Sequence, residues 1–155
     1  MGMDVFGKKP KNETGEYFRN NIWWWHPLWE YCCVVAPDLC AKVENGHTND
    51  GDGLNAKDSA ALAGLLRKEI ESGRTAAYEV TRKVTIDALP DEECPWCKGT
   101  GTRTLEPGKG ADTEPCSRCK TTGRRRPAET YYGFEVVNVV EFAGFLETCG
   151  GFEIW

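Results

Sequence analysis

Cys94-Pro95-Trp96-Cys97-Lys98-Gly99-Thr100-Gly101 is the stretch around which this chain is organised, and Cys116-Ser117-Arg118-Cys119-Lys120-Thr121-Thr122-Gly123 repeats its pattern. The two Cys-x-x-Cys pairs enclose 18 residues, 98–115, a spacing typical of zinc ribbons. Two thiolates separated by two residues can hold one side of a tetrahedral ion, and the second pair closes the other side. The pattern therefore predicts one zinc ion, bound by Cys94, Cys97, Cys116 and Cys119. Four protein ligands leave no open coordination position, which indicates a structural ion.

Paired cysteines also occur as redox motifs and as disulfides. The close spacing and the glycines after each pair argue against both, because glycine permits the sharp turn of a metal knuckle. The chain has eight cysteines, and the four outside the repeats are Cys32, Cys33, Cys40 and Cys149. Cys32 and Cys33 lie in an apolar run, which favours buried, reduced thiols and a reducing compartment.

The Cys-x-x-Cys-x-Gly-x-Gly pattern resembles the cysteine-rich region of the DnaJ-type co-chaperones. The first copy fits fully, and the second has Thr121 where the pattern has glycine. Those co-chaperones carry four copies that bind two zinc ions, whereas two copies here suffice for one. The His-Pro-Asp tripeptide of their J domain is absent from the sequence. The resemblance covers about 30 residues and implies a zinc module without implying chaperone activity.

The chain of 155 residues, 40% of them hydrophobic, is long enough for one domain with a substantial core. Its first residues are polar and charged, so no signal peptide is expected. No apolar run approaches the ~18 residues of a membrane span. These features predict an intracellular protein without a membrane partner.

Hydrophobic periodicity predicts an α+β fold. We expect strands at 4–7 and within 16–25, paired as a hairpin, and a helix that begins at Pro27. A second helix is expected after an Asn55 cap, and a third over 75–89 with Tyr78, Val80, Val84 and Leu89 facing inward. The β-branched residues of 75–89 leave a strand as the alternative there. A short strand at 131–134, a helix at 136–148 and a final strand at 152–155 complete the pattern. Residues 1–93 and 127–155 would form one mostly helical body, and residues 94–126 would be an inserted zinc knuckle or ribbon.

The tryptophans at 23–25, together with Trp29, have two interpretations. They would form the centre of the core, or one or two rings would be exposed as a contact surface. Three consecutive residues of a strand cannot all point inward, because side chains alternate.

The segment 44–54 is rich in Asn, Asp and Gly. Aligning Gly53 with the invariant glycine of an EF-hand leaves Thr48 and Ser59 at positions that need carboxylates, so calcium is disfavoured. A loop whose side chains bond their own backbone is the favoured interpretation. A ligand or catalytic site there remains an alternative, and its candidate residues are His47, Asn49, Asp50 and Asp52.

Charge is distributed unevenly along the chain. Between Cys94 and Arg126, eight basic residues outnumber three acidic ones, so this segment is +5 while the whole chain is −5 and the remainder −10. Such a segment suits contact with phosphate or an acidic protein, although an ordinary solvated surface has the same composition. In a nucleic-acid complex Trp96 would stack on a base and basic side chains would meet phosphates. The candidate residues are Trp96, Lys98, Arg103, Arg118, Lys120, Arg124, Arg125 and Arg126.

Nearly the full length of the chain resembles a family of small uncharacterised bacteriophage and prophage proteins. The resemblance rests on the opening 1–5, the run 15–25, the loop 49–54, the two cysteine repeats and the closing 150–152. It implies a setting in the cytoplasm of a bacterial host cell, where small phage proteins often bind host proteins, including defence systems.

Three functions are therefore expected. The leading one is a non-enzymatic, zinc-stabilised accessory protein that binds a host or phage macromolecule and inhibits, in one version, a bacterial defence system. The second is nucleic-acid binding through the basic cysteine segment. The third is an enzyme with a site in the loop 47–52.

Overall fold

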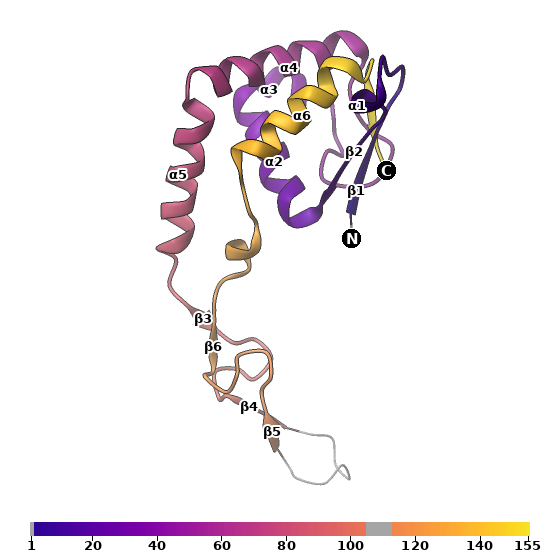
Figure 1. Cartoon of the computed structure of the whole chain (residues 1–155). Coiled ribbons are helices and arrows are strands. Elements are labelled where there is room, and N and C mark those ends of the chain that lie inside the picture. Colours follow the sequence, from indigo (N-terminus) through magenta and orange to yellow (C-terminus); the bar gives the residue numbers. More distant parts are fainter. Residues whose placement is uncertain (1, 105–112) are drawn as a thin grey trace. The chain divides into compact units, whose positions relative to one another are not determined.

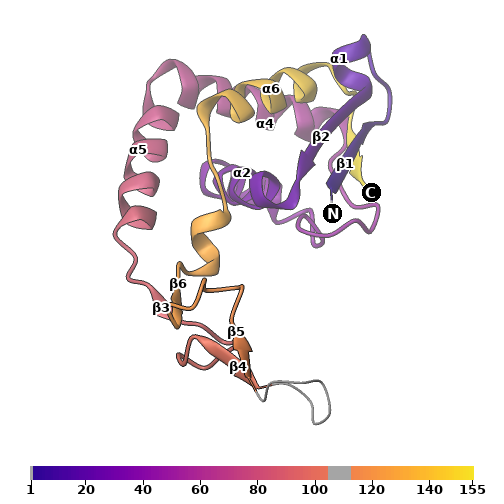
Figure 2. The same ribbon diagram turned by 60° about the horizontal axis from the view of Figure 1, so that its bottom comes forward.

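The computed structural model describes residues 2–104 and 113–155, and the chain divides into two compact units (Figures 1 and 2). The large unit holds the chain up to Lys83 together with Tyr132–Trp155. The small unit is Val84–Tyr131 and contains the cysteine repeats. Helices outweigh short strands, so the predicted α+β class is confirmed. Among the described residues, no helix combines the length and the apolar character needed to cross a membrane.

A three-stranded antiparallel sheet joins the two ends of the chain in the large unit (Figure 1). The strand order is β2 (Tyr17–Asn21), β1 (Gly2–Gly7), β7 (Phe152–Ile154). Val5 lies opposite Phe18 on one side and Ile154 on the other, and all three are buried. Side chains alternate along a strand, so one face of the sheet forms a wall of the core. The predicted hairpin and C-terminal strand are confirmed.

Two long helices, α4 (Ala56–Glu71) and α6 (Val136–Thr148), run side by side in the large unit (Figures 1 and 2). The Asn55 side chain caps α4 by accepting the Asp58 N–H at 2.9 Å, as its sequence predicts. The predicted bounds of α6 are confirmed. Both helices contribute fully buried residues to one core, namely Leu62, Ala63, Leu66, Val139, Phe142, Ala143 and Leu146.

The tryptophan run is helical, which corrects the expectation of a strand up to residue 25. Helix α2 (Ile22–Val35) begins before Pro27, because Asn21 Oδ1 accepts the N–H groups of Trp23 and Trp24. Positions four apart share a helix face, so Trp25 and Trp29 are buried and stack with ring centroids 5.8 Å apart. Trp23 is 41% exposed. The short helices α1 (Glu13–Glu16) and α3 (Pro37–Cys40) complete the large unit's helices.

Two further expectations are wrong. Tyr78 of α5 (Arg74–Asp87) packs against the core as expected, but Val80 and Val84 are 65% and 64% exposed, because buried Thr75 shares the inward face with Tyr78. Residues 131–134 form no strand. Pro127 O accepts the Thr130 N–H and hydroxyl, which closes the 3-10 helix η1 (Ala128–Tyr131), and Phe134 then packs against Tyr78.

The small unit consists of two short ladders around the cysteines. Strands β3 (Glu92–Glu93) and β6 (Arg124–Arg125) pair, and so do β4 (Thr102–Thr104) and β5 (Thr113–Pro115). The first ladder holds the two ends of the cysteine segment side by side, as the convergence of four ligands requires. In the described part of this unit, the one buried apolar cluster is the four cysteines themselves.

Candidate metal centre

Four buried sulfur atoms converge at the centre of the small unit. The Sγ atoms of Cys94, Cys97, Cys116 and Cys119 all lie within 4.8 Å of one another. Cys94 Sγ is 3.9 Å from Cys116 Sγ, and Cys97 Sγ is 3.7 Å from Cys119 Sγ. A tetrahedral ion with metal–sulfur bonds of about 2.3 Å would hold its sulfurs about 3.8 Å apart. The four cysteines are therefore positioned to bind one metal ion.

The same distances exclude disulfides within the cluster. A disulfide joins its sulfurs at about 2.05 Å, well inside the separations of 3.7 and 3.9 Å. All eight cysteines are free thiols. Among the described residues, the cysteine cluster is also the one group of three or more His, Cys, Asp or Glu side chains placed to hold an ion.

The two repeats support each other through reciprocal backbone bonds. Cys94 N–H donates to Gly123 O at 2.9 Å, and Cys116 N–H donates to Gly101 O at the same distance. In each case the first cysteine of one repeat bonds the last glycine of the other. The internal repeat of the sequence thus becomes a two-fold-like arrangement that places one thiol pair on each side of the site.

A threonine in each repeat, outside the predicted set of site residues, holds the turn between the two cysteines and the glycines. Thr100 Oγ1 donates to Cys97 O, and Thr122 Oγ1 donates to Cys119 O, both at 2.7 Å. Each threonine follows its first cysteine by six positions, at 94 to 100 and 116 to 122, so aligning the repeats would have revealed it. In addition, Gly101 N–H donates to Cys97 Sγ at 3.3 Å and helps to stabilise a thiolate there.

Gly101 and Gly123 permit the close approach of the repeats. Both have left-handed backbones, with φ of 77° and 72°. A Cβ at Gly101 would lie 2.3 Å from Thr121 O, and one at Gly123 would lie 2.1 Å from Gly99 O. Neither contact is sterically possible, so both positions require glycine.

The thiols of the second repeat do not ionise alike. Burial raises the pKa of Cys119 to about 11, with its neighbouring thiols adding to the effect. Burial acts in the same direction on Cys116, but bonds from the backbone of Cys119 and Arg118 outweigh it and lower its pKa to about 7. These backbone bonds favour the thiolate at Cys116, and the thiolate is the metal-binding form.

The three consecutive arginines bond to the small unit's own chain. Arg125 donates twice to Glu92 Oε1, at 2.8 and 2.9 Å. Arg124 donates to a backbone carbonyl at residue 91, and Arg126 donates to the carbonyls of residues 86 and 89. These bonds fasten β6 to the segment that leads into the first repeat. Arg103 faces Glu114 at 3.8 Å.

The other residues predicted to contact nucleic acid form fewer interactions within the described part of the chain. Lys98, Arg118 and Lys120 make no ion pair among the described residues, and all three are exposed. Trp96 is 46% exposed, with the guanidinium carbons of Arg118 and Arg125 at 5.2 and 5.0 Å from its ring centroid. Lys109, which contributed to the charge count, lies outside the described residues, as do Glu106 and Asp112.

The polar loop covers the free edge of β7. The backbone of Asp52 forms an isolated antiparallel β-bridge with Ile154. The Asp52 Oδ2 atom accepts the Asn45 N–H at 2.9 Å. Asp50 accepts a bond from the Thr48 hydroxyl, and Asn49 donates to Gly2 O. Three of the four candidate side chains in the loop thus form bonds with the chain itself.

His47, the fourth candidate, lies beside the other histidine of the chain. Its ring centroid is 4.8 Å from that of His26 on α2, and the rings meet edge to face. Burial lowers the pKa of His47, His26 lowers it further, and Glu30 opposes the shift. No local pattern in the sequence indicates this pair, because 20 residues, 27–46, separate the two histidines.

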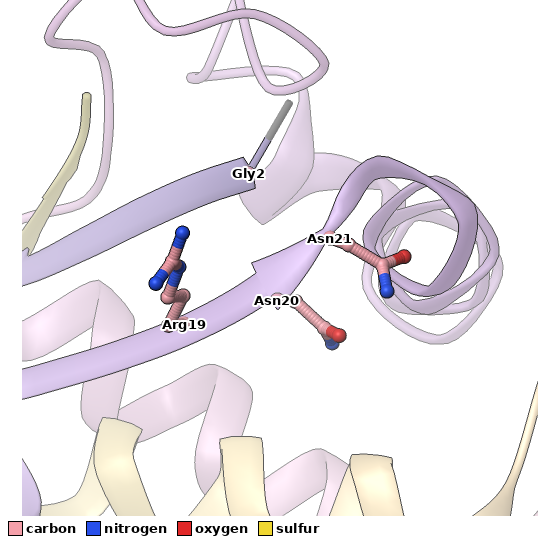
Figure 3. A pocket seen from close by; sticks show the side chains of 4 residues that line it. All are labelled: Gly2, Arg19, Asn20 and Asn21. Atoms are coloured by element: carbon pink, nitrogen blue, oxygen red, sulfur yellow. The ribbon is translucent and has the colours of Figure 1, made fainter.

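An open polar pocket of about 480 Å³ lies at the start of α2, lined by Gly2, Arg19, Asn20 and Asn21 (Figure 3). Arg19 and Asn20 leave β2 on opposite sides. Asn20 donates to Asn138 Oδ1 at 2.7 Å, Arg19 faces Asp4 at 3.5 Å, and Asn21 caps α2. The polar side chains that line this pocket therefore already form bonds within the large unit.

Fold and site together define an α+β protein with a four-cysteine metal site. No protein-family model, curated protein or solved structure matches the chain.

Proposed function

We propose that this chain is a non-enzymatic binding protein whose small unit is built on one structural zinc ion. The convergence of four buried thiols carries the proposal. Zinc is the common ion of closed tetrahedral thiolate sites, and such sites contribute folding energy directly. Isolated zinc-finger peptides gain roughly 10–16 kcal/mol from their ion. A unit whose described buried cluster is only four cysteines needs a contribution of this kind.

A closed site of four cysteines leaves the ion no position for substrate. The role of such an ion is to hold the surface of the small unit in a defined shape. On that surface Trp96 is 46% exposed, with the guanidinium groups of Arg118 and Arg125 beside its ring, and Lys98 and Lys120 of the same unit are exposed. Tryptophan and arginine are the residues most often central to protein interfaces. These features support a macromolecular partner for the small unit.

We propose a bacteriophage or prophage setting for this partner, on the sequence resemblance alone. The partner would then be a host or phage macromolecule in the bacterial cytoplasm. Inhibition of a host defence system is the specific version of this proposal.

Nucleic acid is the second candidate partner, and one observation favours it. Lys98, Arg118 and Lys120 are exposed and lack acidic partners among the described residues, and Arg118 lies beside the Trp96 ring. Phosphates would neutralise these cations and a base would stack on the ring. The opposing alternative, an enzyme with a site in the loop 47–52, has less support because Asp50 and Asp52 bond within the loop.

Purification of the untagged protein from bacterial cells tests the proposal, with native mass spectrometry to measure zinc per chain and any retained partner. We expect one zinc ion and a stoichiometric protein, both lost in Cys94→Ser. Cys33→Ser is the matched control, because Cys33 is half-buried and outside the cluster. A wild-type protein without zinc would contradict the metal site, and zinc without any partner would contradict the binding role.

The nucleic-acid alternative predicts a different result. Bound RNA or DNA would be released by salt, and replacing Lys98, Arg118 and Lys120 with alanine would reduce the salt dependence by roughly 0.7–0.9 per lost phosphate contact. Replacing Arg124 with alanine is a poor test, since it also breaks the bond to residue 91. Salt-independent retention of a protein would exclude this alternative.

A further inference from the structure

We propose that His26 and His47 form a second metal site in the large unit, which takes a divalent transition-metal ion such as Zn²⁺, Co²⁺ or Ni²⁺. The fold brings together the chain's two histidines, one from α2 and one from the loop that covers β7. Imidazole is a preferred ligand of all three ions. The site is separate from the cysteine cluster and does not depend on the proposed function of the small unit.

The spacing of the two rings fits a shared ion. With metal–nitrogen bonds of about 2.0–2.1 Å, each ring centroid lies roughly 3.2 Å from the metal, so two imidazoles at square to tetrahedral angles have centroids about 4.5–5.2 Å apart. The observed separation is 4.8 Å. The interplanar angle of 68° shows that the rings do not stack face to face. Face-to-face stacking would direct their nitrogens away from a common point.

The position of His47 is fixed by its neighbour Gly46. Trp25 Nε1–H donates to Gly46 O at 2.8 Å, and a Cβ at Gly46 would lie only 2.1 Å from Trp29 Nε1. The backbone next to His47 is therefore held directly against the two buried tryptophans of α2. His26 follows Trp25 in that helix, so the same anchoring aligns both ligands before an ion arrives.

The ring nitrogens are available for a ligand. Among the described residues, neither histidine makes a hydrogen bond through its side chain, and their contacts are with each other and, for His26, with the Tyr132 ring at 5.7 Å. Water would complete the coordination around the two imidazoles.

Cobalt titration of the full-length, metal-stripped protein at neutral pH tests this site. The cysteine cluster should bind one equivalent with the strong sulfur-to-cobalt charge-transfer band of a thiolate site. A second, weaker equivalent should follow without that band. We expect His47→Gln and His26→Gln to weaken the second equivalent by more than about tenfold, because even the outer partners of metal ligands commonly contribute that much.

Asp50→Asn is the matched control, since it changes a carboxylate of the same loop and should leave the second equivalent intact. Saturation at one equivalent in the wild-type protein, or a second equivalent that survives both histidine variants, would overturn the proposal. If a histidine variant unfolds, the wild-type protein is treated with diethylpyrocarbonate after one and after two equivalents of cobalt. The second equivalent should protect the two histidines from modification. Equal modification at one and two equivalents would refute the site. The thiolate band reports the first site independently, so the failure of either site is visible separately.

Discussion

Thr121 in the second cysteine repeat has the left-handed backbone of its counterpart Gly99 in the first, with φ of 67° against 77°. The first repeat has glycine at this position and the second has threonine, so two different residues hold the same backbone conformation. A β-branched residue in this region is strained.

Replacing Thr121 with glycine should therefore stabilise the small unit. Relief of left-handed strain is worth roughly 1–2 kcal/mol, and the greater freedom of glycine in the unfolded chain offsets about 0.5–1 kcal/mol of it. Chelator competition should show tighter metal retention by Thr121→Gly. The reciprocal variant Gly99→Thr should show weaker retention, and equal retention by both variants would contradict the strain argument.

Gly101→Ala should disrupt the metal site, although it adds only one methyl group. The new Cβ would meet Thr121 O at 2.3 Å, which forces the two repeats apart. We expect loss of zinc measured by native mass spectrometry. Gly64→Ala is the contrasting control, because a Cβ there meets nothing within 4 Å and alanine favours helix α4 by up to about 1 kcal/mol. A Gly101→Ala protein with full zinc content would refute this account.

Metal removal should unfold the small unit and leave the large unit folded. The described part of the small unit has no buried cluster except its cysteines, whereas the large unit has an extensive apolar core. Addition of a chelator should collapse the NMR signals of 84–131 and make four thiols reactive. The buried thiols of Cys32, Cys40 and Cys149 should stay unreactive. Unchanged signals from both units would show that the ion is dispensable.

Acid should weaken the junction between Lys42 and the first turn of α4. The Lys42 ammonium donates to Asp58 at 2.8 Å and, with Asn55, holds the pKa of that carboxyl below its ordinary value of 3.8. A carboxyl group whose pKa is lower in the folded than in the unfolded state stabilises the folded state when the pH is above the unfolded pKa. This contribution is lost as the pH falls through the folded pKa. Asp58→Asn should thus flatten the decline of thermal stability below about pH 4. An unchanged slope would mean that other carboxyl groups cause the decline.

The elements that followed from the sequence are those with strong local signals. Asn55 and Asp58 predict the start of α4, and the bounds of α6 agree with its periodicity. The start of α2 was misplaced because Pro27 suggested a first helical position, while the cap made by Asn21 begins the helix at Ile22. The inward face of α5 was also misjudged, since nothing local indicates that Thr75 rather than Val80 meets the core.

The four-cysteine cluster follows from the sequence alone, because two thiols two residues apart on a tight turn are a local geometry, and the repeat contains it twice. The sequence also determined that the ends of the cysteine segment meet, since four ligands must converge. Only the tertiary structure decided that Arg124–Arg126 fasten β6 to the chain before the first repeat, and that His26 lies beside His47. These arrangements depend on which surfaces pack together over long sequence separations, and periodicity and spacing carry no information about such contacts.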